Sequence, residues 1–197
     1  MLSKDDYSAH VIPYRMKAVA VFNLATRFLT QWNGEPRPLE IRFDGKVSIR
    51  GLSTAFTNPT IEAGIIHCRA LLEFLGLKCA KTDPARLAQR QSKMDDDLVI
   101  EDFAGSHGPL TKVTVAQAVE PYAGSKDEAE RALAAVIHTA NKGLAHMTSG
   151  HLVDLGNLRL FEIASRGVPT LVANHFYVAR GLAPPDWQVA KAAHDVA

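Results

Sequence analysis

A mainly α fold is the structure that this sequence predicts: a bundle of about four to five long helices, with a β-hairpin inserted at about residues 39–50. Apolar residues recur at the roughly 3.6-residue period of an amphipathic helix through most of the chain. The period shortens to two only between Leu39 and Arg50, which indicates paired strands. A chain of 197 residues with 47% apolar side chains is long enough to bury one core. We therefore expect one domain over residues 1–183 and a C-terminal tail over residues 184–197.

Residues 13–32 are expected to form the first helix, with Pro13 in its first turn and Asn33-Gly34 after its end. At about 100° per residue, one face of this helix is apolar. The side chains on that face are Tyr14, Ala18, Val21, Ala25, Phe28 and Trp32. We expect this face to meet the core.

The hairpin is predicted from apolar and polar residues that alternate on both sides of Asp44-Gly45. A two-residue turn would pair Phe43 with Lys46 and would place the two apolar sets on opposite faces. A three-residue loop with a bulge pairs Phe43 with Val47 and Ile41 with Ile49, and we favour it for that reason. Because a lone hairpin is only marginally stable in water, its apolar face must cover the helices or meet a partner chain.

Residues 58–78 are expected to form a helix that is apolar nearly all round, which is typical of a central helix. Its polar residues Glu62, His67, Arg69 and Glu73 then need partners, since buried charge is costly unless it is paired. Cys68 falls on the apolar stripe, so a structural thiol is expected there rather than a nucleophile.

Further helices are expected along the rest of the chain. A short polar helix follows Pro84 and runs to about Met94, and another covers residues 112–120. Ser125 caps a long helix that runs to about Thr148. Two more helices are predicted over residues 152–166 and 169–180, separated by a break at Gly167-Val168-Pro169.

Composition excludes several classes of protein. The formal net charge of +1 is too small to attract nucleic acid or an anionic membrane through a global electrostatic field. The sequence contains no uninterrupted run of about 18 apolar residues, so a transmembrane helix is not expected. The sequence lacks a P-loop, a dinucleotide fingerprint, a His-Glu-x-x-His motif and a Cys-x-x-Cys motif, so no cofactor is expected. His146, His151 and Asp154 have loose spacing for a metal site, and we expect none. Cys68 and Cys79 are expected to be reduced thiols in a cytoplasmic protein.

Two polar groups on separate helices are candidates for a site. His146 lies on the flank of the 125–148 helix, one turn from Lys142, where an imidazole can act as acid or base near neutral pH. The alternative is a boundary histidine with one structural hydrogen bond. His67 and Arg69 form the second group, with the turn at Asp95-Asp96-Asp97 as a source of carboxylates. Here the alternative is that Arg69 and Glu73 form a structural ion pair at i,i+4 spacing.

These residues also carry a resemblance. His67-x-Arg69-x-Leu71-x-x-Phe74-Leu75, Asp95-Asp96 and Asn141-Lys142-x-x-Ala145-His146-x-Thr148 together resemble a pattern in a group of uncharacterised bacterial proteins. The helical layout is loosely similar to the HEPN superfamily of small, commonly dimeric bundles, many of which are ribonucleases.

The resemblance implies roles for individual residues. His146 would be the acid or base, with Asn141 and Lys142 on phosphate, while His67, Arg69, Asp95, Asp96 and Thr148 would bind the ligand. Active members of the superfamily carry an Arg-x4–6-His motif, and here Asn141 stands in place of the arginine. The charge of a phosphate would then fall to Lys142 or Arg69.

Three readings of the polar residues stay open. They form a metal-independent ribonuclease or nucleotide-binding module, or a non-catalytic dimeric protein that binds a protein partner or a small anionic ligand, or a purely structural network between helices. Convergence on an open concave pocket favours the first two readings, whereas sealed and mutually paired side chains favour the third.

Overall fold

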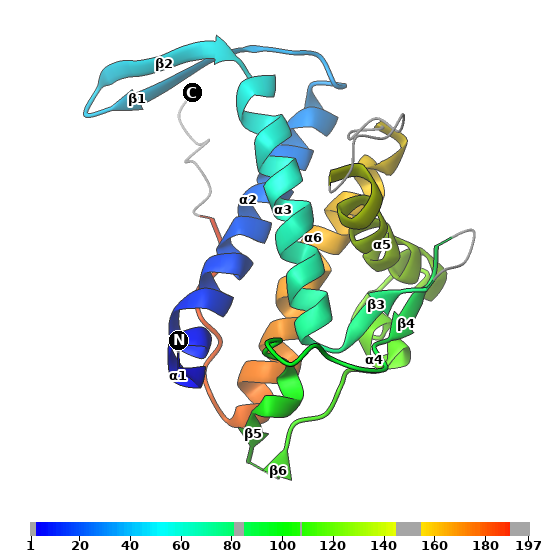
Figure 1. The fold of residues 1–197 in the computed structure, drawn as a ribbon. Coiled ribbons are helices and arrows are strands. Elements are labelled where there is room, and N and C mark those ends of the chain that lie inside the picture. The colour runs from blue at the N-terminus through cyan, green and yellow to red at the C-terminus, as the bar shows by residue number, and fades with distance from the viewer. Residues whose placement is uncertain (1–2, 81–84, 107, 145–154, 190–197) are drawn as a thin grey trace.

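Long helices make up most of the structure, and the predicted mainly α fold with an inserted hairpin is confirmed (Figure 1). This computed structural model describes residues 3–80, 85–106, 108–144 and 155–189. Within these ranges, four long helical segments pack together, and three antiparallel two-stranded sheets lie around them.

The first helical segment starts earlier than predicted. α1 (Lys4–Asp6), η1 (Tyr7–Val11) and α2 (Ile12–Gln31) follow one another without a break, so Pro13 lies inside a helical run. Ser3 caps the start, because its hydroxyl accepts from the Asp6 N–H at 3.0 Å.

The predicted apolar face of α2 is wrong. Tyr14 is 64% exposed, and of the predicted set only Ala25 is buried. The buried stripe instead contains Ile12, Met16, Val19, Phe22, Ala25, Thr26 and Leu29. Apolar residues cover more than one face of this helix, and α2 turns the stripe that carries Met16 and Phe22 toward both α3 and α6.

The hairpin consists of β1 (Pro38–Phe43) and β2 (Lys46–Leu52). Asp44 and Gly45 form a two-residue turn with φ values of 50° and 76°, so the predicted Phe43–Val47 pair is wrong and Phe43 lies opposite Lys46. The predicted Ile41–Ile49 pair is confirmed, because the register shifts between Ile41 and Arg42. The turn and a bulge are therefore both present, and the bulge sets the register.

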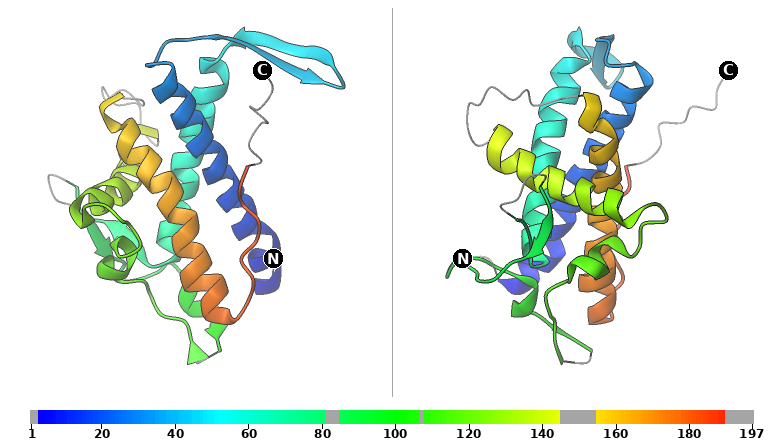
Figure 2. Two further views of the ribbon diagram at one scale, coloured as in Figure 1. Left: turned by 180° about the vertical axis from the view of Figure 1, so that it is seen from behind. Right: turned by 90° about the vertical axis from the view of Figure 1, so that its right-hand side faces the viewer.

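The hairpin extends away from the bundle at the end where α2 finishes and α3 begins (Figures 1 and 2). Its apolar side chains do not cover the helices: Phe43 is 65% exposed, and Ile49 and Leu52 are 53% exposed.

α3 (Thr54–Phe74) is the central helix, as predicted, and it packs against α2, α5 and α6. It begins one turn before the predicted start, so Pro59 lies in its second turn. Cys68 is fully buried, and burial raises the pKa of its thiol, in line with a structural role.

The chain that follows α3 forms strands. The helix ends before Gly76, which has a φ of 88°, and β3 (Leu77–Cys79) pairs with β4 (Leu87–Gln89). The predicted extension of the helix to Lys78 and the predicted polar helix up to Met94 are both wrong. Leu77 and Leu87 are buried, and the strand pair lets both side chains reach the core.

The second half of the chain supplies two long helices. After η2 (Ile100–Asp102), the short pair β5 (Ala104–Gly105) and β6 (Gly108–Pro109), and α4 (Val115–Val119), Ser125 caps α5 (Lys126–Thr139) as predicted. η3 (Ala140–Leu144) continues α5. The last segment comprises η4 (Leu155–Asn157), α6 (Leu158–Val172), η5 (Ala173–Tyr177) and η6 (Val178–Arg180).

The predicted break at Gly167-Val168-Pro169 is wrong, because α6 runs through it. Val168 and Pro169 are buried together with Leu171 and Val172. A continuous apolar face therefore compensates for the one backbone hydrogen bond that the proline lacks.

The described part of the tail packs on the bundle. Residues 184–189 run back beside α2 (Figure 2), and Trp187 packs partly buried against the core. The Tyr177 hydroxyl donates to the Ser8 carbonyl at 2.7 Å, which ties the last helical segment to the first.

Gly64 provides a test of this packing. A Cβ built at Gly64 would overlap the side chain of Phe22, whereas a Cβ built at Gly167 meets nothing within 4 Å. Gly64→Ala should therefore lower the free energy of unfolding by roughly 1–3 kcal/mol, measured by chemical denaturation. Gly167→Ala is the matched control and should be neutral or stabilising by about 0.5–1 kcal/mol. Equal stability of the Gly64 variant and the natural protein would contradict the close contact of α2 and α3.

Candidate functional site

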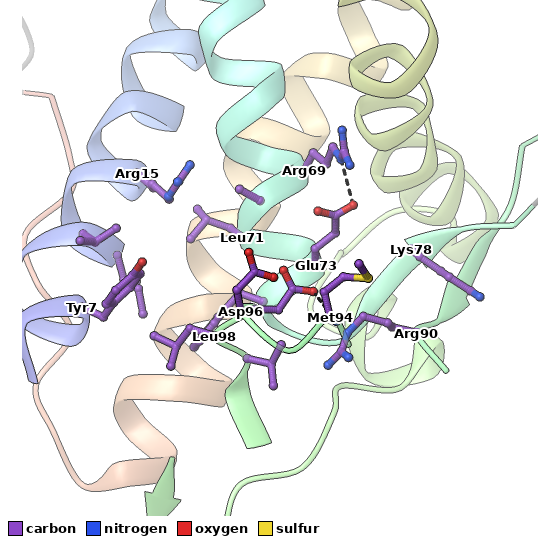
Figure 3. A pocket seen from close by; sticks show the side chains of 16 residues that line it. Tyr7, Arg15, Arg69, Leu71, Glu73, Lys78, Arg90, Met94, Asp96 and Leu98 are labelled. Carbon is purple, nitrogen blue, oxygen red and sulfur yellow. Dashed lines mark hydrogen bonds and ion pairs between the residues drawn. The ribbon is translucent and has the colours of Figure 1, made fainter. Parts of the chain in front are cut away.

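A cavity of about 570 Å³ opens between the first helical segment, α3 and the chain from Lys78 to Val99 (Figure 3). Its apolar wall comes mainly from Val11, Ile12, Leu71, Phe74, Leu98 and Val99, with Tyr7 at one side. The volume lies in the range of small-molecule sites.

Four cations line this cavity, and they differ in how they are held. The Arg69 guanidinium donates to Glu73 at 2.9 Å, which is the predicted ion pair. Arg90 donates to both carboxylate oxygens of Glu101 at 3.2 Å. No carboxylate of the described residues lies within ion-pair distance of Arg15 or Lys78, and Figure 3 shows Lys78 pointing away from the centre of the cavity.

Three carboxylates line the same cavity. Glu73 is the partner of Arg69, and Asp97 accepts from the Met94 N–H at 2.9 Å, which closes the acidic turn. Asp96 is exposed and lies between Arg15 on one side and Glu73 on the other (Figure 3). The site is therefore charged with both signs and is open to water rather than sealed.

His67 holds Arg15 in place. Its half-buried ring lies with Nδ1 3.1 Å from Nη1 of Arg15, and because a guanidinium only donates, Nδ1 is the acceptor. The edge of Tyr14 meets the same ring at a centroid distance of 5.5 Å. Burial, and then the charge of Arg15, lower the pKa of His67, so the ring accepts this bond in its neutral form.

The structure brings together only some of the residues that the sequence nominates. Arg69 and Asp96 line one cavity, with His67 beside it, but Asp95 does not line it. Asn141 and Lys142 lie on η3, which packs against α3, and neither lines the cavity.

Other nominated residues fall elsewhere. His146 and Thr148 lie outside the described residues, as do His151 and Asp154. Within the described ranges, no group of three or more His, Cys, Asp and Glu side chains is placed to hold a metal ion. Among the helices of those ranges, none has both the length and the apolar composition that a membrane crossing needs.

Sequence reasoning missed Arg15, Lys78 and Arg90. Arg15 and His67 are 52 residues apart, so no spacing rule connects them. The sequence pattern predicts helices at Lys78 and Arg90, whereas Lys78 lies on β3 and Arg90 directly follows β4. The strand that positions Arg90 covers only Leu87–Gln89, and three residues are too few for an alternating pattern to indicate a strand.

The lowered pKa of His67 sets a pH dependence of stability. The unfolded chain takes up a proton below a pH of about 6.5, while folded His67 resists protonation. The free energy of unfolding is thus fully retained above that pH and falls as the solution becomes more acidic. His67→Gln should give a shallower loss of stability between pH 7.5 and the lowered pKa, measured by urea denaturation across that range. His175, whose pKa burial also lowers, leaves a residual slope, and exposed His138→Gln serves as the control. An unchanged slope in the His67 variant would contradict this assignment.

Comparisons with known proteins found no counterpart. No protein-family model, no curated protein and no solved structure matches this chain.

Proposed function

We propose that this protein is a binding module for a small phosphate-bearing ligand of the nucleotide class, held in the cavity between α2 and α3. One observation carries the proposal: Arg15 and Arg69 line the same open cavity from neighbouring helices, and no carboxylate of the described chain pairs with Arg15. A guanidinium matches phosphate oxygens with paired donors.

The partner of Arg15 strengthens this argument. His67 accepts from Arg15 as a neutral ring, so the bond orients the guanidinium without neutralising its charge. Arg15 keeps further N–H donors for a ligand, since a guanidinium has five. A pre-oriented cation at the mouth of a cavity loses little side-chain freedom when an anion binds.

The remaining lining residues fit the rest of a nucleotide. Tyr7 and Phe74 offer aromatic surface for a base, and aliphatic side chains beside them exclude water. Asp96 is free to accept from a sugar hydroxyl or from an exocyclic amino group, which an acidic side chain commonly does. Because the cavity carries both signs of charge, it favours a ligand with donors as well as phosphate over a bare anion.

The geometry of the cavity supports ligand binding rather than catalysis. Cleavage of RNA would also need an acid or base, a role that the resemblance assigns to His146, which lies outside the described residues. Asn141 and Lys142, which the resemblance places on phosphate, do not line the cavity. We therefore propose nucleotide binding and keep ribonuclease chemistry as an extension of it.

Isothermal titration with AMP, ATP and inorganic phosphate tests the binding proposal. Arg15→Gln should weaken nucleotide affinity by about tenfold or more, because a hydrogen bond to a charged group contributes roughly 1.5–3 kcal/mol. Exposed Lys17 lies on the same helix outside the cavity, and Lys17→Gln should leave the affinity unchanged. Absence of nucleotide binding by the natural protein, or equal affinity of the two variants, would refute the proposal.

The exposed apolar side chains of the hairpin favour a second candidate role, which is self-association into a homodimer. Phe43 and Ile49 are more than half exposed and share one face of the hairpin, because Ile49 pairs with Ile41, which lies two residues from Phe43. Within the described chain, no third strand pairs with either edge of this sheet. We propose that a second copy covers this surface, since two-fold pairing of identical arms is self-complementary and buries the same residues on both chains.

Sedimentation equilibrium tests the dimer. The natural protein should sediment as a dimer, and the double variant Phe43→Ser, Ile49→Ser should shift it to the monomer. Leu182→Ser is the matched control, because Leu182 is 44% exposed but lies far from the hairpin along the chain, after η6. A monomeric natural protein would rule out this use of the hairpin.

A further inference from the structure

A second cavity, of about 330 Å³, lies between α5, α6 and the segment from α4 to Ser125. It shares no residue with the proposed nucleotide site. Its walls are mainly carbon, from Ala118, Leu133, Ile163 and Leu171, which are buried, and from the ring of Tyr122. Walls of this composition favour an apolar occupant, because binding removes apolar surface from water.

The loop that forms one wall is fixed by its own hydrogen bonds. The Tyr122 hydroxyl donates to Glu128 at 2.9 Å, and Glu128 in turn accepts from Arg159 at 2.6 Å. The Lys126 ammonium donates to the carbonyls of Glu120 and Tyr122 at 2.6 and 2.7 Å. These bonds hold the wall without any ligand, so the cavity is preformed and binding needs little ordering of the chain.

Gly167 lines the opposite wall with bare backbone. It lies in the middle of α6, and a Cβ built on it meets no heavy atom within 4 Å. Glycine within a helix costs roughly 0.5–1 kcal/mol relative to alanine. Open space therefore lies over α6 where any other residue would place a side chain.

One charged side chain lines this cavity. Arg166 is 61% exposed and lies 3.5 Å from Glu162, a long and solvated contact that leaves guanidinium donors available. Thr170 lies one turn away and lines the cavity as well, although its hydroxyl donates to the Arg166 carbonyl. An apolar chamber with a single cation at its edge is complementary to an apolar body with a single anionic head.

We propose that this cavity binds a small hydrophobic monocarboxylate. The hydrocarbon part lies between Tyr122, Leu133 and the bare backbone of Gly167, and the carboxylate pairs with Arg166 at the mouth. This site is independent of the proposed nucleotide site, and either can fail without the other.

Calorimetric titration with octanoate tests this proposal. Gly167→Leu should fill the chamber and abolish octanoate binding, while Gly167→Ala, which adds one methyl group, should retain it within a few-fold. Ala123→Phe fills the same space from the loop side and covers the case in which the leucine variant fails to fold. Nucleotide titration of each variant reports on the other site and should not change.

The role of Arg166 is tested by removing its charge and by comparing an acid with the corresponding alcohol. Arg166→Gln should weaken octanoate binding by about tenfold and leave the affinity for 1-octanol unchanged, because only the acid needs the cation. Arg131→Gln, an exposed arginine on α5, is the control and should change neither affinity. Failure of the natural protein to bind octanoate, or octanoate binding that survives Gly167→Leu and Ala123→Phe, would overturn the proposal. Equal effects of Arg166→Gln on the acid and the alcohol would overturn the assignment of the anionic head.

Discussion

The close approach of α3 to α2 at Gly64 is the constraint on which the rest of the structure depends. Without a Cβ at this position, the side chain of Phe22 lies directly against the α3 backbone, and the two helices pack nearer than larger residues would permit. Phe22 also contacts the ring of Phe161 on α6 at a centroid distance of 6.1 Å, so one side chain joins three helices. The same proximity brings Arg15 of α2 to within hydrogen-bond distance of His67 on α3 and so creates one side of the proposed nucleotide site.

Signals that act over a few residues predicted the fold well. The helical period, the alternation around Asp44-Gly45 and the cap at Ser125 depend on neighbours along the chain, and the corresponding elements form where expected. Errors arose where burial decided the outcome. Pro169 is a helix breaker by local rules, yet the apolar face on both sides of it packs as one surface. α2 carries apolar residues on several faces, and only its neighbours determine which face is buried.

Some residues of the proposed nucleotide site can likewise be predicted from neighbours along the chain, and others cannot. The Arg69–Glu73 pair follows from i,i+4 spacing, and Asp96 belongs to an acidic run that is visible in the sequence. Arg15 could not be selected, because its role depends on a ring 52 residues later and on the lack of an ion-pair partner among the described carboxylates. A sequence shows which side chains are charged, but the three-dimensional arrangement decides which charges stay unneutralised.

The bulge in the hairpin has a consequence for how the protein behaves in concentrated solution. An extra residue in one strand interrupts the regular ladder between Ile41 and Arg42 and increases the local twist, which disfavours stacking of identical arms edge to edge. Arg42 and Arg50, both bonded to Glu40, add charge along that ribbon. The exposed side chains of Phe43 and Ile49 thus lie on a ribbon whose bulge and charged residues are both features that disfavour open-ended strand pairing.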